Sequence, residues 1–352
     1  MQLVAYGAQD VYLTGNPQIT FFKVVYRRHT NFSMECIEQT LNGSINSGAS
    51  SVECTISRNG DLIGNMHLDV KMANQTALTA SNSTYLNWTN NTGHALIKDV
   101  ELEIGGQKID KQYGHWLDVY NELTDHNEEE HTLLNKHSSK NAYLRSATAG
   151  TSRQLQLYVP LKFWFNRNPG LALPLIALQY HEVKVKLNTR GMTGLVNSDV
   201  TLEGSATAPS VKLWADYIYL DTDERKRFAQ VSHEYLIEQL QEEKFVLGNN
   251  HKLNFNHPVK ELIWVVQDDT VRTEGTSSVN ATLNVAGADM THNNDYFNYN
   301  SRSSNNEEVV NGVANKEGFQ KAQLKLNGQD RFAAQNASYF RLVQTKQAGH
   351  KV

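Results

Sequence analysis

Apolar and polar residues alternate with a period of two along most of this chain, which is the spacing of half-buried β-strands. Clear runs of this kind occupy residues 51–57, 62–72, 98–104 and 212–220. Asn59-Gly60 is a tight-turn signal, so we expect a hairpin between the first two runs. Gly105-Gly106 predicts a second hairpin, from 98–104 into 107–109. The pattern indicates a large antiparallel β protein.

Longer apolar stretches complete an expected first domain. Residues 19–41 are rich in β-branched and aromatic residues and too long for one strand, so we expect two strands there. Residues 154–165 and 175–187 predict two long strands that close the domain together with 211–220. Helical spacing is found in 113–123, whose apolar stripe we expect to cap an end of the barrel. Two polar stretches predict surface loops, 73–94 and 125–151.

A connector separates two β-rich halves. After the strand 212–220, Asp221 is a candidate helix N-cap and Glu224 stands at the capping-box position, so we expect a short helix. Residues 231–241 suit a helix or a strand, and we favour an extended conformation. The expected parts are an N-terminal arm, a first domain, a connector and a second domain, over 1–14, 15–220, 221–241 and 242–352.

The two halves share a short internal repeat. VELEIGGQ at 100–107 is matched by AQLKLNGQ at 322–329, a spacing of 222 residues, so we expect a duplicated domain. Only 24 residues follow Gly328, whereas the first copy continues through its two long closing strands. We therefore expect the second copy to stop early. By the same reasoning, residues 1–220 should fold alone and residues 242–352 should not.

Composition and charge exclude several classes of protein. The formal net charge is −4 with 20% charged residues, which disfavours a nucleic-acid binder. No apolar run approaches the roughly 20 residues of a membrane-spanning helix, and the first residues lack a secretory signal pattern. Cys36 and Cys54 are the two cysteines, and we expect free, buried thiols.

No catalytic constellation stands out in the sequence. His126 and His131 flank three glutamates in HNEEEH, but the zinc-protease motif needs histidines four residues apart. The basic run 26–29 fits a strand-edge ion pair or a subunit contact better than a phosphate site. Walker, dinucleotide, nucleophile-elbow and zinc-cysteine spacings are absent, so we expect no enzymatic activity, metal or cofactor. Among the N-x-[ST] triplets, Asn280 is the candidate glycan acceptor.

Six segments in order resemble the major capsid protein of nucleocytoplasmic large DNA viruses, the iridovirus, phycodnavirus, mimivirus and marseillevirus groups. They are GNPQITFFKVVYRRHTNF (15–32), ISRNGDLI (56–63), ALIKDVELEIGGQKID (95–110), PLKFWFNRNPGLALPLIALQYHEVKVKL (160–187), DYIYLDTDERKRFAQVSHEYLIEQLQ (216–241) and LNFNHPVKELIWVVQ (253–267). The resemblance implies an all-β tandem double jelly roll, with two eight-stranded antiparallel sandwiches and a few short helices. It also implies a homotrimer of pseudo-hexagonal outline in an icosahedral shell, in contact with neighbouring capsomers and minor capsid proteins.

The resemblance further implies a place and an orientation in the virion. We expect assembly in the host cytoplasm, an inner viral membrane nearby and no direct contact with nucleic acid. The polar stretch 268–320 should project on the outer face and the arm 1–14 should lie on the inner side. Relatives continue beyond the final segment into further strands, so we expect part of a longer chain, with an incomplete second jelly roll, rather than a shortened paralogue. The alternative function is that of a minor capsid or vertex paralogue that binds host glycans.

Overall fold

The computed structural model of the chain describes residues 30–73, 86–125, 129–136, 154–198, 206–246, 248, 250–267, 294, 296–297, 299 and 319–351. Among these residues, no helix has both the length and the apolar character needed to cross a membrane.

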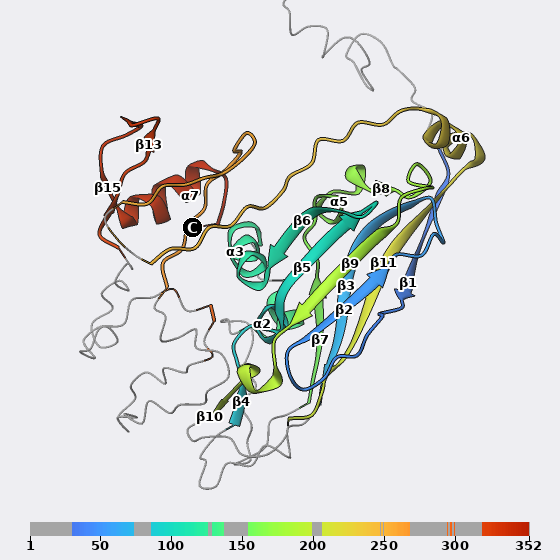
Figure 1. Cartoon of the computed structure of the whole chain (residues 1–352), viewed down its shortest axis with the longest axis horizontal. Coiled ribbons are helices and arrows are strands. Elements are labelled where there is room, and N and C mark those ends of the chain that lie inside the picture. Colours follow the sequence, from blue (N-terminus) through green and yellow to red (C-terminus); the bar gives the residue numbers. More distant parts are fainter. Residues whose placement is uncertain are drawn as a thin grey trace, which may run out of the picture.

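The first half is a sandwich of two antiparallel sheets (Figure 1). One sheet has the order β1-β11-β3-β7, with β8 also paired to β3, and the other has the order β2-β9-β5-β6. The first sheet contains β1 (Phe32–Gln39), β3 (Leu62–Met72), β7 (Leu155–Pro160), β8 (Leu173–Pro174) and β11 (Ser210–Leu220). The second contains β2 (Ser50–Thr55), β5 (Ile97–Ile104), β6 (Gln107–Tyr113) and β9 (Val183–Thr189). The last long strand pairs with the first, which is the order of a jelly roll.

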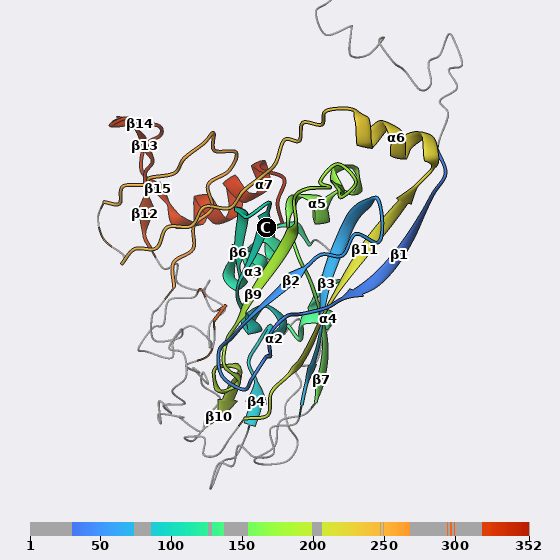
Figure 2. The same ribbon diagram turned by 45° about the vertical axis from the view of Figure 1, so that its right-hand side comes forward.

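The core lies between the two sheets, where alternate side chains of each strand meet. The strand β9 buries every second residue, and β3 buries Leu68 and Val70 almost completely. Burial of one such side chain contributes roughly 1.5–3 kcal/mol, so the two facing layers supply most of the driving force for folding. Figure 2 shows the two layers, one with β2 and β9 and the other with β1, β3 and β11.

The tight hairpin at Gly105-Gly106 is confirmed. Gly105 has φ +59° and Gly106 has φ +81°, the two positive values of a type I′ turn, and β5 pairs with β6 across it. Glycine is needed at this turn because other residues seldom adopt a positive φ.

The expected hairpin at Asn59-Gly60 is wrong, because β2 and β3 lie in opposite sheets. β2 pairs with β9, whereas β3 pairs with β11 and β7. The link crosses between the layers: the Ile56 amide donates to Val183 O at 2.9 Å, and the Asp61 amide donates to Ile218 O at 3.1 Å. The Asp61 carboxylate also accepts from the Leu220 amide at 2.8 Å, which holds the link on the β11 side.

The two long closing strands are shorter than predicted. β7 ends at Pro160 and is followed by α5 (Trp164–Arg167) and the 3₁₀ turn η1 (Pro169–Leu171), while β9 begins only at Val183. The three aromatic residues 163–165 are all buried, which a strand with one core face cannot achieve, but a helical turn can. Asn166 fixes this turn, since its side chain accepts from the Phe163 amide at 3.2 Å and donates to Gly64 O at 2.7 Å.

Short helices close one side of the sandwich. They are α2 (Thr92–Leu96), α3 (Gly114–Thr124), α4 (His131–Leu134) and the 3₁₀ turn η2 (Met192–Leu195), near the two-stranded ladder of β4 (Leu86–Trp88) and β10 (Val196–Ser198). The helix predicted at 113–123 is confirmed, but it buries Leu117, Asp118 and Asn121, while Trp116 and Tyr120 remain half-buried. The surface loop predicted at 73–94 is wrong for residues 88–94, most of which are buried.

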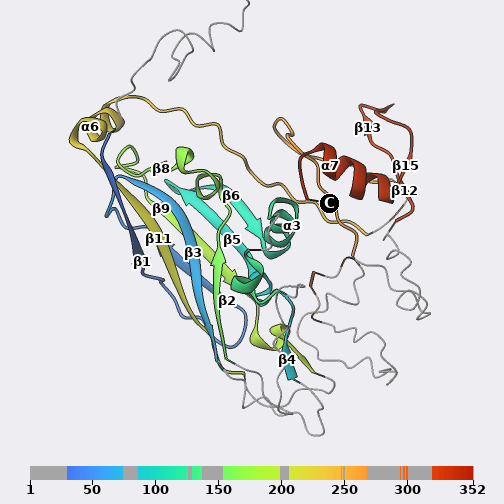
Figure 3. The same cartoon turned by 180° about the vertical axis from the view of Figure 1, so that it is seen from behind.

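The connector contains the predicted helix, α6 (Thr222–Gln230), with Asp221 as its N-cap. The Asp221 carboxylate accepts from the Thr222 amide at 2.7 Å instead of the amide three residues on, so the cap forms without the expected box. Residues 231–246 then run without helix or ladder, so the helical alternative for 231–241 is wrong and no strand forms there either. Figures 1 and 3 show this segment leading from α6 to the second half, which lies beside α3 and β6, away from β1.

The second half repeats one part of the first. β13 (Lys325–Leu326) and β14 (Gln329–Asp330) form a hairpin through Asn327 and Gly328, whose φ values of +51° and +81° match those of Gly105-Gly106. β12 (Lys321–Ala322) pairs with β15 (Gln335–Asn336), and the π-helical turn η5 (Tyr339–Gln344) and α7 (Thr345–Gln347) follow, as α3 follows β6. The internal repeat in the sequence is therefore a repeat in structure.

The second jelly roll is incomplete in the described part of the chain. In the first roll, β11 lies between β1 and β3, and β9 lies between β2 and β5. Of the strands in these two sheets, β5 and β6 are consecutive in the chain and pair directly. The described residues 231–246, 248 and 250–267, which precede the repeated hairpin, carry no backbone ladder, and the described counterpart of the β5–β6 pair is β13 with β14. Side chains hold them instead: Gln241 bonds both ways with the Asn256 backbone at 2.9 Å.

We predict that Gly114→Ala strongly destabilises the first roll. A Cβ at this position would lie 2.4 Å from the carbonyl oxygens of both His94 and Ile97, and backbone cannot yield as a flexible side chain can. The free energy of unfolding should fall by on the order of 3 kcal/mol, measured as a lower urea midpoint of tryptophan fluorescence. Gly48→Ala is the matched control, because a Cβ there meets nothing within 4 Å. Equal midpoints for the two variants would contradict the prediction.

Candidate functional site

The structure describes only some of the residues that the sequence singled out. Asn280, His126, the basic run 26–29 and the arm 1–14 lie outside the described residues. His131 is buried in α4, with its Nε2 atom 3.8 Å from the Glu122 carboxylate. In the described ranges, no group of three or more His, Cys, Asp or Glu residues could hold a metal ion.

The two cysteines occupy different environments, which corrects the expectation that both are buried. Cys54 is buried on β2, and burial followed by the charge of Glu53 raises its pKa to about 11. Cys36 is exposed on β1, where partial burial of its thiol, and then its hydrogen bond with Asp216, raise its pKa to about 11. Both thiols are therefore protonated at neutral pH, which makes them poor nucleophiles.

The strand β1 borders its sheet and exposes apolar side chains. Phe32 is 65% exposed and Met34 is 56% exposed, and they pair in register with Leu220 and Ile218 of β11. We call these four residues the β1 edge. A sheet border of this kind presents backbone groups and apolar surface that another chain can cover.

The outer face of the other sheet carries cross-strand ion pairs. Lys184 contacts Glu53 at 3.0 Å, Lys186 contacts Glu103 at 2.5 Å, and Lys111 contacts Glu101 at 2.7 Å. Such partly exposed pairs contribute little to stability, but they place alternating opposite charges on this face. This face suits a polar contact better than a catalytic one.

A buried polar cluster lies among α2, α3 and α4. Asn91, in a left-handed conformation with φ +50°, donates to Asp118 Oδ1 at 2.8 Å and lies 3.0 Å from His94 Nδ1. Lys136 donates to the same Asp118 oxygen at 2.6 Å and also pairs with Glu122. Because an isolated charge in this position would be costly, the pairs fix the three helices relative to one another.

The pKa directions in this cluster follow from burial and from Lys136. Burial lowers the pKa of His94 well below 6.5, and the positive charges of Lys136 and Lys162 act in the same direction. Burial raises the pKa of Asp118 despite its pairing with Lys136. Burial would lower the pKa of Lys136, but Asp118 and Glu122 together outweigh this effect and raise it. His94 is thus neutral in the folded protein.

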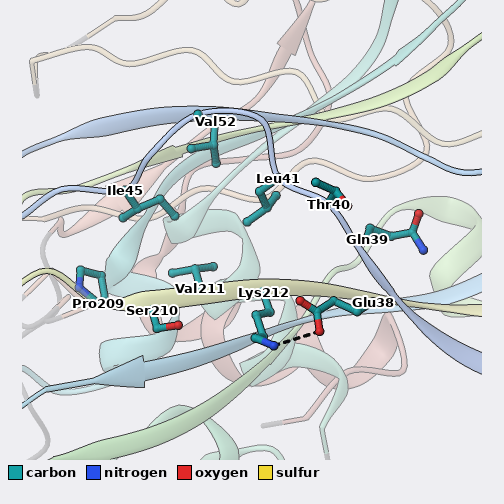
Figure 4. A pocket seen from close by; sticks show the side chains of 11 residues that line it. Glu38, Gln39, Thr40, Leu41, Ile45, Val52, Pro209, Ser210, Val211 and Lys212 are labelled. Atoms are coloured by element: carbon teal, nitrogen blue, oxygen red, sulfur yellow. Dashed lines mark hydrogen bonds and ion pairs between the residues drawn. The ribbon is translucent and has the colours of Figure 1, made fainter.

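A hollow of about 370 Å³ lies between the loop after β1 and the start of β11 (Figure 4). Leu41, Ile45 and Val211 form its apolar part, while Glu38 and Lys212 form an ion pair of 2.9 Å along it. The two ionisable groups neutralise each other. The hollow therefore offers no acid, base or nucleophile aimed at a bound molecule.

The two halves contact each other along β6 and α5. The Leu240 amide donates to Asp110 Oδ1 at 3.0 Å, and Gln239 donates through its side chain to Ile109 O at 2.5 Å. Glu238 pairs with Arg167 at 2.9 Å. These bonds attach the connector to the β6 border of the second sheet and cover part of this edge.

The stretch expected to project outward contains buried residues. Asn294 and Tyr296 are each 2% exposed and pack on η2 and β10 of the first half. The expectation of outward projection is thus wrong for these two residues. They and the buried cluster were missed in the sequence because Asn, Thr and His normally indicate surface.

Comparisons with known proteins agree with a jelly-roll shell protein. Residues 20–221 match the family described as "Major capsid protein N-terminus", and residues 224–352 match "Large eukaryotic DNA virus major capsid protein". The chain therefore belongs to the family of major capsid proteins of large eukaryotic DNA viruses. The predicted family and double jelly-roll fold are confirmed.

Two relatives and one solved structure illustrate the similarity. The chain is 46% identical to the major capsid protein of Pyramimonas orientalis virus, over 100% of this chain and 76% of that protein. It is 43% identical to the major capsid protein of Paramecium bursaria Chlorella virus 1, over 99% and 77%. The crystal structure of PBCV-1 VP54, fitted into a reconstruction of the virophage Sputnik, gives a TM-score of 0.63 at 35% identity, over 93% and 77%. The chain thus spans about three quarters of these proteins.

We predict that His94 makes the protein sensitive to mild acid. Since the folded state holds His94 neutral, the unfolded state binds the extra proton first as the pH falls below about 6.5. Stability is therefore lost toward pH 5, by up to about 1.4 kcal/mol per pH unit from this one group. Urea unfolding between pH 7 and 5 should show a shallower decline for His94→Gln than for the natural chain. The exposed His257→Asn should keep the natural slope, and parallel curves for all three proteins would refute the assignment.

Proposed function

We propose that the chain is a structural shell protein, a major capsid protein whose copies form trimeric, pseudo-hexagonal capsomers of an icosahedral virion. The observation that carries this proposal is the complete jelly roll followed by a repeat of its β5–β6 hairpin, in a chain of the capsid family. Two similar units per chain give three chains six similar units around one axis. Catalysis is not part of this function, because the described surfaces offer packing faces and no positioned reactive groups.

The β1 edge supports lateral contact between copies. It combines a strand border that has no ladder partner among the described residues with exposed Phe32 and Met34, whereas the β6 border is contacted by the chain's own connector. We assign the remaining contacts to neighbouring capsomers and to minor capsid proteins. A trimer contact here would remove the apolar surface from water.

The strand directions support an orientation of the subunit. The segments after β1, β3 and β9 leave the sandwich at one end, while Phe32 and Leu220, which are paired in register, lie at the other. We assign the first end, and the stretch 268–320 apart from the buried Asn294 and Tyr296, to the outer face of the shell. The arm 1–14 then lies on the inner side, near an inner viral membrane, after assembly in the host cytoplasm.

We also propose the division of the chain into the arm 1–14, the first roll 15–220, the connector 221–241 and the second roll 242–352. The end of β11 at Leu220 and the helix Thr222–Gln230 support the two central boundaries. Asn280 remains our candidate glycan acceptor on the outer stretch.

We predict that the purified chain is a trimer and that the β1 edge is needed for it. Multi-angle light scattering should give three times the mass of one chain. The double variant Phe32→Glu, Met34→Glu should shift the mass toward one chain, because two carboxylates would have to be buried in the contact. Tyr180→Glu is the control, since Tyr180 is 94% exposed on a turn and is not one of the four residues of the β1 edge. A stable monomer of the natural chain would overturn the trimer.

Copy number distinguishes the proposed function from that of a minor or vertex paralogue that binds host glycans. A shell protein is the most abundant polypeptide of the particle, whereas a vertex protein is present at few sites. Gel densitometry of purified particles should therefore show this chain as the main band. A minor band would favour the glycan-binding alternative.

A further inference from the structure

We propose that the first roll contains a built seat for an Asn-x-Tyr segment, and that the chain's own residues 294–296 occupy it as an intramolecular lock. The seat consists of Thr89, Arg190, Thr193, Gly194 and Val196. It lies where η2 leads into β10, beside the start of β5. The lock fastens the polar stretch of the second half to the first half.

Tyr296 fills the deeper part of the seat. Its side chain is 2% exposed, and its hydroxyl donates to Gly194 O at 2.8 Å. The Arg190 guanidinium lies over the ring, 4.5 Å from the ring centre. Arg190 is itself held by donating to Ala95 O at 2.6 Å and to Ile97 O at 3.0 Å. A fixed cation above a buried aromatic ring and a matched acceptor for its hydroxyl form a specific site for tyrosine.

Asn294 provides the second point of recognition. Its side-chain amide donates to Val196 O at 3.0 Å and to Thr193 O at 3.3 Å. The backbone carbonyl of Asn294 accepts from the Thr89 hydroxyl at 2.5 Å. The seat thus forms hydrogen bonds with the side-chain amide and the backbone carbonyl of Asn294 and with the hydroxyl of Tyr296. Burial of an apolar surface alone would not require these matched polar partners.

The seated segment has two further contacts, one within the second half and one with the first roll. The Gln267 side chain donates to Tyr296 O at 2.6 Å, and the Phe297 ring meets the His115 ring of α3 edge-on at 5.6 Å. Gln267 ends the described extended segment, so residues 267 and 296 are brought together on the surface of the first roll. Through Tyr296, the described end of the segment 250–267 is thus linked to η2.

A glycine in the seat provides a sharp test. A Cβ on Gly194 would lie 2.8 Å from the Tyr296 hydroxyl oxygen. Apart from its neighbours along the chain, it would meet no other described atom within 4 Å. Gly194→Ala should therefore expel Tyr296 without disturbing anything else. Tyr296→Phe removes the obstructing oxygen, so the double variant should seat the ring again.

The experiment is hydrogen exchange with mass spectrometry on the full chain. In Gly194→Ala and in Asn294→Ala, backbone amides of 192–198 and 294–299 should exchange about tenfold faster than in the natural chain. Tyr296→Phe combined with Gly194→Ala should restore most of the protection. Tyr180→Phe, at an exposed tyrosine, should change nothing.

Amides of β2 and β9 report whether a variant still folds. The first contradicting outcome is that, in both Gly194→Ala and Asn294→Ala, the amides of β2 and β9 stay protected and those of 192–198 and 294–299 exchange as in the natural chain. The seat is then not occupied, and the proposal is overturned. If Gly194→Ala unfolds the whole roll, failure of Tyr296→Phe to rescue it would also overturn the proposal, since the predicted clash would not be the cause. Rescue of folding would support it.

Discussion

The fold depends on one constraint of backbone hydrogen bonding: the last strand of the roll lies in the middle of a sheet. β11 supplies partners to both β1 and β3, and β9 does the same for β2 and β5, so early strands remain unpaired until late ones arrive. The second half shows the converse. Its described strands form only two-stranded ladders, β12 with β15 and β13 with β14, so none of them has a partner on both sides, and the segment before them relies on side chains such as Gln241.

The sequence predicted the parts of the fold that are set locally. The I′ turns at Gly105-Gly106 and Asn327-Gly328 follow from residues that tolerate positive φ, and α6 follows from the cap at Asp221. The partner of β2 could not be predicted, because alternation shows that a strand has a core face but not which strand lies beside it. The helical turn Trp164–Arg167 forms for a tertiary reason, since the three consecutive aromatic side chains of residues 163–165 are all buried in the core.

The candidate sites were less predictable than the fold. The β1 edge is a property of the sheet order, and Phe32 looks in sequence like any core residue of a strand. His94 and Asp118 read as surface residues, yet both are buried because they satisfy one another through Asn91. Tyr296 lies in a stretch of polar composition, and nothing in its neighbours along the chain reveals that Arg190 covers it.

The central position of β11 also determines how long β1 stays unpaired while the chain is synthesised. β1 ends at Gln39 and β11 ends at Leu220, so the ribosome adds 181 residues before the partner of β1 is complete. At about 5–20 residues per second this interval lasts roughly 10–40 s. From the synthesis of β3 until β11 is complete, β1 and β3 lack the strand that lies between them in the sheet. In a cell that makes many copies at once, unpaired strands of neighbouring nascent chains lie close together on polysomes. The risk that strands of different chains pair with each other is therefore greatest before each chain is released from the ribosome.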